Sequence, residues 1–185
     1  MRALALPGAA VISGPCFQDA RGFFSETYRK RDFAALGVDV DFVQENWSMS
    51  EVAGTIRGLH FQAPPHAQAK LLQVLRGAIF DALVDLRRGS PTFGQWCGIT
   101  LRSGAAECLY VPEGFAHGFC TLENDTLIAY KVSAYYDQAS EGGVIWNDPD
   151  LRIEWPIAAE AARLSEKDRR LPRLADLTSP FGYAA

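Results

Sequence analysis

The sequence is short of the residues that build metal sites. Only three of its 185 residues are histidine, no H-x-H pair occurs, and the four cysteines form no C-x-x-C pair. Zinc sites and other catalytic metal sites commonly draw on such closely spaced ligands. We therefore expect no metal site. The scattered cysteines, most of them inside apolar runs, are typical of small core residues in a reducing compartment.

Long apolar runs and a positive net charge are also missing. No stretch approaches the ~20 apolar residues of a membrane span. Pro7 and Gly8 interrupt the apolar N-terminal segment early, so we expect no signal peptide. A net charge of −4 offers no basic field for nucleic acid, although arginines gathered in one pocket could still hold a small phosphorylated ligand. These features predict a cytoplasmic protein without nucleic-acid or membrane partners.

Most of the chain has the pattern of short β-strands. No helical pattern separates the strands between Gln44 and Tyr136, which argues against an α/β fold. Runs rich in Val, Ile, Leu, Phe and Tyr alternate with turn residues at about 8–12-residue spacing. We expect strands at 9–13, 23–28, 41–50, 55–62, 70–75, 78–87, 96–101, 108–112, 118–122 and 127–136. So many short strands predict one all-β domain over 1–185, a β-sandwich or double-sheet jelly roll.

Two segments have helical character. Residues 28–38 place Phe33 and Leu36 at helical spacing and end on Gly37, which predicts a short helix. The second segment is the alanine-rich 158–170. The expected fold is therefore all-β with short peripheral helices, mainly at the C-terminus.

The stretch RGLHFQAPPHAQAK, residues 57–70, concentrates reactive side chains next to strand-like sequence. It could be an active-site rim or a polar surface loop. Arg57 and His60 are three positions apart, so a regular strand points them to opposite faces. Both can line one cavity only if the strand bends, most easily at Gly58. Lys70 is either a solvated strand end or a fixed cation facing a developing oxyanion. We expect His66 to lie on the surface without a role.

A second motif is VPEGFAHGF, residues 111–119. Pro112, Gly114 and His117 match the P-x-G-x-x-H of the second cupin motif. Because the H-x-H of metal-binding cupins is absent, the motif predicts a metal-free, cupin-like jelly roll. His117 then contacts a ligand or supports a group that does. In the strand-like segment 127–136, Tyr130 could be an ordinary strand residue or a proton donor on a rigid element.

With these motifs come D-x-R-G-x-F-x-E at 19–26, Q-x-N-x-S-x-S at 44–50, VDLRRGSPTFGQW at 84–96, WNDP at 146–149 and SEKD at 165–168. In this order and spacing they resemble the dTDP-4-dehydrorhamnose 3,5-epimerase family over nearly the whole chain. The resemblance implies a cofactor-free homodimer that acts on a nucleotide-linked 4-keto-6-deoxyhexose.

The resemblance also assigns roles to individual residues. His60 becomes the general base, oriented by Asp168. Lys70 stabilises the enolate oxygen at C4, and Tyr130 returns a proton on the opposite face of the sugar. Residues that contact the nucleotide, the diphosphate or the sugar are Arg21, Phe24, Glu26, Gln44, Asn46, Arg57, His117, Tyr136, Glu141 and Lys167.

These roles fit the chemistry of inverting a carbon next to a ketone. The proton must leave on one face and return on the other while a donor stabilises the enolate. Two alternatives stay open. The first is an epimerase that processes one carbon only, or a related sugar nucleotide in a natural-product pathway; Tyr136 is the residue expected to decide between one carbon and two. The second is a sugar-nucleotide-binding cupin without catalysis, against which the base, acid and oxyanion donor argue.

Overall fold

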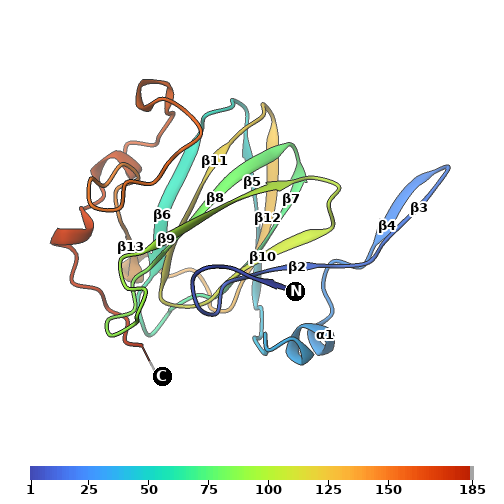
Figure 1. Ribbon diagram of the computed structural model, residues 1–185, viewed down its shortest axis with the longest axis horizontal. Helices are drawn as coiled ribbons and strands as arrows, with labels where there is room; N and C mark the ends of the chain where they lie inside the picture. The colour runs from blue at the N-terminus through green and yellow to red at the C-terminus, as the bar shows by residue number, and fades with distance from the viewer. Residues whose placement is uncertain (184–185) are drawn as a thin grey trace.

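The computed structural model describes residues 1–183, so the expected domain boundary at 185 lies outside the described residues. Two sheets face each other as the layers of a sandwich (Figure 1). The six-stranded sheet has the order β1 (Arg2–Ala3), β2 (Ala10–Ser13), β10 (Glu107–Val111), β7 (Lys70–Arg76), β12 (Thr126–Val132) and β5 (Gln44–Ser50). The five-stranded sheet has the order β13 (Glu141–Gly143), β6 (Ile56–Gln62), β11 (Phe115–Thr121), β8 (Ala78–Asp85) and β9 (Trp96–Arg102).

The core lies between the two sheets. Its largest cluster combines Leu72 and Ile128 of the six-stranded sheet with Ile79, Leu83 and Phe119 of the five-stranded sheet. Side chains of a strand alternate between its two faces, so each sheet turns one apolar face inward. All neighbouring strands pair antiparallel. The predicted all-β double-sheet fold is therefore confirmed.

The helix expected near the N-terminus is confirmed, and the helical character expected at the C-terminus takes the form of short 3₁₀ turns. Helix α1 (Lys30–Ala35) buries Phe33, and Gly37 adopts a φ of +89° just beyond it. The segment 158–170 forms only the 3₁₀ turns η2 (Ala159–Ala161) and η3 (Asp168–Arg170). Between them Arg163 pairs with the edge of β6, because its carbonyl accepts a hydrogen bond from the Ile56 N–H. None of the described helices is long and apolar enough to span a membrane.

The strand expected at 127–136 is too long at its C-terminal end. Strand β12 stops at Val132, and residues 133–137 form a loop before η1 (Gln138–Ser140). The segment just before β7 holds this loop: Gln68 Nε2 donates to the Ala134 carbonyl, and Ser133 Oγ accepts from the Ala69 N–H. Such contacts with a distant segment give no periodic signal in the sequence.

A hairpin projects from the body of the molecule (Figure 1). Its strands β3 (Cys16–Asp19) and β4 (Gly22–Ser25) form a sheet of their own. The rings of Phe17 and Phe24 are 62% and 68% exposed although both are large and apolar. Apolar side chains held out on a hairpin are unusual for a free surface and mark an interaction site.

Candidate active site

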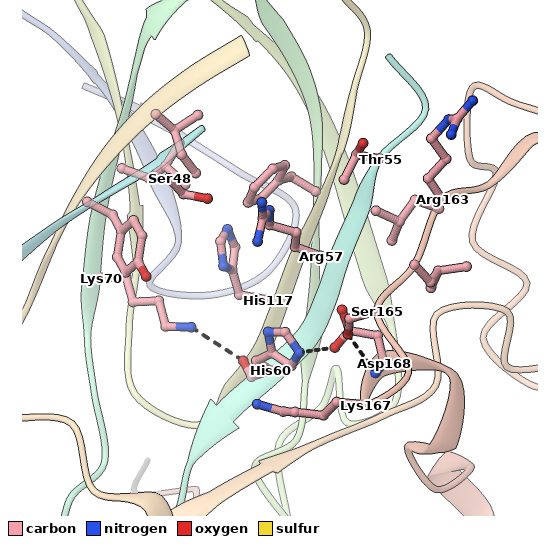
Figure 2. A pocket seen from close by; sticks show the side chains of 16 residues that line it. Ser48, Thr55, Arg57, His60, Lys70, His117, Arg163, Ser165, Lys167 and Asp168 are labelled. Atoms are coloured by element: carbon pink, nitrogen blue, oxygen red, sulfur yellow. Dashed lines mark hydrogen bonds and ion pairs between the residues drawn. The ribbon is translucent and has the colours of Figure 1, made fainter. Parts of the chain in front are cut away.

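A cavity of about 490 Å³ opens between the two sheets. Strands from both sheets contribute to its wall, and the segment around η3 closes one side (Figure 2). The cavity brings together seven of the residues that the sequence singled out: Arg57, His60, Lys70, His117, Tyr130, Lys167 and Asp168. A smaller pocket of about 180 Å³ shares His60, Lys70 and Tyr130 with it.

His60 and Asp168 form a hydrogen-bonded pair in this cavity (Figure 2). Asp168 Oδ1 lies 2.5 Å from His60 Nε2, and the carboxylate is almost fully buried. Burial alone raises the pKa of Asp168, but the hydrogen bond and charge of His60, with help from Ser165 and Lys167, outweigh it and hold that pKa below its ordinary value. The ionised carboxylate accepts from the Nε2–H, which leaves Nδ1 of neutral His60 as the proton acceptor.

A bulge in β6 lets Arg57 and His60 share the cavity. His60 pairs with His117 on β11 but Arg57 pairs with Phe119, so β6 holds one residue more than its partner over this span. Gly58 lies inside the bulge with a φ of +132°. A bulge residue of this kind redirects neighbouring side chains to one face. Both side chains do line the same cavity.

Replacing Gly58 with alanine is expected to destabilise the fold by about 2–4 kcal/mol. A Cβ at this position would lie 2.5 Å from Gly118 Cα and 2.9 Å from the His117 carbonyl oxygen, and both obstacles are backbone. Thermal or urea unfolding of Gly58→Ala measures the loss. Gly22→Ala is the matched control, because Gly22 also has a positive φ but open space around it. Equal stability of the two variants would contradict the close packing at Gly58.

Lys70 is a partly buried cation beside the base. Its Nζ lies 3.4 Å from the His60 carbonyl oxygen (Figure 2). Burial lowers the pKa of Lys70 to about 8, although the charges of Asp81 and Glu141 oppose the shift. An ammonium group in such a water-poor site can stabilise a developing oxyanion strongly.

Tyr130 reaches the cavity from the six-stranded sheet, whereas His60 reaches it from the five-stranded one. Burial raises the pKa of Tyr130, and the charge of Arg57 offsets part of that effect. Arg57 itself is fixed across the sandwich: its guanidinium donates to Ser50 Oγ at 3.2 Å and to the Met49 carbonyl at 3.0 Å on β5. The cavity therefore holds an acceptor and a hydroxyl donor on opposite walls.

Asp81 is a buried partner that sequence reasoning missed. Its Oδ2 lies 2.9 Å from His117 Nε2, and both side chains are almost completely buried. Burial raises the pKa of Asp81, against the opposing influence of His117 and Lys70. Its other oxygen, Oδ1, has no hydrogen-bond partner among the described residues. A lone carboxylate inside the apolar run AIFDALV was the one available signal.

The smaller pocket is lined mainly by amides and aromatic rings. In addition to the shared residues, its wall contains Gln44, Asn46, Phe61, Gln62, Gln68, Tyr136 and Glu141. Amides donate and accept hydrogen bonds, and an exposed ring can stack on a planar group. Lys167, from the rim of the large cavity, forms an ion pair with Glu141 and so joins the two pockets.

Three predicted ligand contacts lie elsewhere. Arg21 and Phe24 line a pocket formed only by hairpin residues, and Arg21 pairs with Asp19 at 2.6 Å. Glu26, just after the hairpin, pairs with Arg29 at 2.9 Å. Within one chain these three residues are separate from the cavity. Residues 1–183 also contain no cluster of three or more His, Cys, Asp or Glu side chains that could hold a metal ion.

The family model described as dTDP-4-dehydrorhamnose 3,5-epimerase matches residues 3–176. A solved structure of such an epimerase from Bacillus anthracis (strain Ames), with TDP and PPi bound, is 50% identical. It matches with a TM-score of 0.90 over 93% of this chain and 97% of that one.

Two further solved structures are similar. One is a dTDP-6-deoxy-D-glucose-3,5-epimerase from Legionella pneumophila in complex with dTDP-4-keto-L-rhamnose, 38% identical, with a TM-score of 0.94 over 100% of this chain and 98% of that one. The other is ChmJ, a 3′-monoepimerase from Streptomyces bikiniensis in complex with dTDP-quinovose. It is 36% identical, with a TM-score of 0.88 over 95% of this chain and 88% of that one. This chain belongs to the dTDP-4-dehydrorhamnose 3,5-epimerase family.

Proposed function

We propose that this protein epimerises a dTDP-4-keto-6-deoxyhexose at C3 and C5. The observation that carries the proposal is the hydrogen-bonded pair of His60 and Asp168, which shares one cavity with the Lys70 ammonium and the Tyr130 hydroxyl. C3 and C5 both flank the C4 ketone, so one enolate-stabilising cation serves both carbons. Family membership and the nucleotide-bound relatives support a dTDP-sugar as the ligand.

The reacting groups come from both walls of the cavity, His60 from the five-stranded sheet and Lys70 and Tyr130 from the six-stranded sheet. His60 Nδ1 removes the proton next to the ketone while Asp168 stabilises the imidazolium that forms. Lys70 stabilises the negative charge that moves onto the C4 oxygen. Tyr130 returns a proton to the other face of the carbon. No carbon changes its net oxidation state, so these steps require no redox cofactor. After each inversion His60 holds one proton more and Tyr130 one fewer, and proton exchange with solvent restores both residues.

A heavy-water experiment tests the proposal. The protein is incubated with dTDP-4-keto-6-deoxyglucose in D₂O, and the positions of deuterium are followed by NMR. We expect label at both C3 and C5. Label at one carbon only would support the second candidate, a single-carbon epimerase, which the likeness to ChmJ favours. Binding of dTDP without any exchange would support the non-catalytic alternative and reject the proposal.

We propose further that the active molecule is a homodimer in which the β3–β4 hairpin reaches the cavity of the partner. Phe24 and Arg21 are exposed on a hairpin that projects from its own subunit (Figure 1). The outer face of β5 also exposes apolar side chains, Trp47 at 66% and Met49 at 44%. A second copy that covers these surfaces would bury the apolar rings and bring the hairpin residues to a cavity.

Complementation between two defective variants is expected to restore activity. Arg21→Ala/Phe24→Ala damages the hairpin, and His60→Ala damages the cavity. In a mixed dimer the intact cavity receives the intact hairpin of the other subunit, so one of the two sites works. Refolding the two variants together in equal amounts should raise the exchange rate to about a quarter of that of the wild type, because random pairing makes half the molecules mixed. No gain on mixing, with mixed dimers verified by differential tags, would contradict hairpin exchange.

A further inference from the structure

Gln62 ends strand β6, two positions after His60, and is almost completely buried at 4% exposure. Its side-chain amide makes three hydrogen bonds with backbone groups. Nε2 donates to the His66 carbonyl at 2.8 Å and to the Tyr135 carbonyl at 3.2 Å. Oε1 accepts from the Asp137 N–H at 2.7 Å. Both amide protons and one oxygen lone pair are therefore used.

Two of these bonds flank Tyr136 directly, one on each side along the chain. Tyr136 itself is tied at two more points: its N–H donates to Gln44 Oε1 at 3.2 Å, and its hydroxyl donates to Glu141 Oε2 at 3.3 Å. Yet its ring is 56% exposed at the wall of the smaller pocket. Because both the backbone N–H and the hydroxyl of Tyr136 are hydrogen-bonded, its exposed ring forms a contact surface that is already in place before a ligand binds.

We propose that Gln62 is a positioning residue that fixes Tyr136 relative to His60 and thereby determines whether the second carbon is processed. The inference rests on the proposed epimerase function. His60 and Gln62 belong to one rigid strand, so the amide sets the distance between the base and the loop that carries Tyr136. A two-carbon epimerase must hold its substrate through two rounds of proton removal. A Tyr136 that moves freely releases the sugar nucleotide after the first round.

A purely structural role for Gln62 is the alternative. Buried amides commonly stabilise loops without affecting a reaction. The two roles differ in what they change. If Gln62 is only structural, replacing it lowers the unfolding temperature and changes the exchange rates at C3 and C5 by the same factor. If Gln62 positions Tyr136, replacing it weakens dTDP binding and changes the ratio of label at the two carbons.

Gln62→Glu tests the inference. The carboxylate has no proton to give, so the carbonyls of His66 and Tyr135 lose their donor. We expect the dissociation constant of dTDP to rise about tenfold. Label at the slower carbon divided by label at the faster carbon should fall severalfold, while the exchange rate at the faster carbon stays close to that of the wild type. Gln138→Glu is the matched control, because Gln138 lies exposed in the same loop two residues after Tyr136.

A second variant covers the case in which Gln62→Glu fails to fold. Gln62→Met keeps the length of the side chain and removes all three hydrogen bonds. It should weaken dTDP binding in the wild type but not in a Tyr136→Ala background, because the amide acts through Tyr136. Equal loss in both backgrounds, or an unchanged ratio of label, overturns the inference. Absence of exchange in the wild-type protein would instead reject the proposed function.

Discussion

His60→Ala is expected to reduce deuterium exchange at both C3 and C5 by about 10²–10⁴-fold. His60 Nδ1 is the free acceptor, because Nε2 is committed to the Asp168 carboxylate at 2.5 Å. Alanine cannot take the proton, and no other histidine reaches its place: His117 is bound to Asp81 and His66 lies outside the cavity. NMR of dTDP-4-keto-6-deoxyglucose in D₂O measures both rates.

Binding of dTDP should survive this substitution, since the smaller pocket and its amides are unchanged. His66→Ala is the matched control. The His66 ring lies outside both pockets, where Nδ1 is 3.0 Å from Ser140 Oγ, so exchange should stay within about twofold of the wild type. Near-normal exchange by His60→Ala would show that another group is the base.

Lys70→Gln is expected to slow exchange by about 10²–10³-fold through the loss of the oxyanion partner. Glutamine keeps much of the volume and a weak donor but not the charge. The Lys70 ammonium stands 3.4 Å from the His60 carbonyl oxygen, and its charge faces the cavity that holds His60. The exchange assay measures the loss. Lys30→Gln removes an exposed lysine that pairs with Asp41 near α1 and should leave exchange unchanged. Full activity of Lys70→Gln would remove the lysine from the mechanism.

The same lysine predicts a pH limit. The pKa of Lys70 is lowered to about 8 by burial, so its protonated form is complete well below that pH and disappears above it. Since only the ammonium stabilises the enolate, the exchange rate of the wild type should fall as the pH rises through about 8. Lys70→Gln should lack this decline. A wild-type profile that is flat to pH 10 or so would contradict the lowered pKa.

The sequence predicted the sandwich because strand length and alternation are local properties. It also identified the stretch 57–70, where His60 and Lys70 do lie together in the cavity. The pair of His60 and Asp168 joins residues 108 positions apart, and only the resemblance to a family suggested it. No periodic pattern reports such a contact.

The errors have physical causes of the same kind. The alanine-rich segment 158–170 has helical propensity, but backbone pairing of Arg163 with Gly54 and Ile56 keeps it extended. Tertiary contacts override weak local preference there. Asp81 was missed because the alternation of residues along a strand does not indicate which side chains of other strands they contact. Its partner His117 belongs to another strand. Arg21 and Phe24 lie outside the cavity, on the β3–β4 hairpin, because the hairpin forms a sheet of its own away from the two main sheets.

The central claim is that this cavity removes and returns protons on carbons beside a ketone. The most direct test is the time course of deuterium uptake by dTDP-4-keto-6-deoxyglucose in D₂O, with wild-type protein and with His60→Ala at equal concentration. We expect label at C3 and C5 with the wild type and almost none with His60→Ala, although both bind dTDP. Equal uptake by the two proteins, or tight dTDP binding without uptake by either, would contradict it.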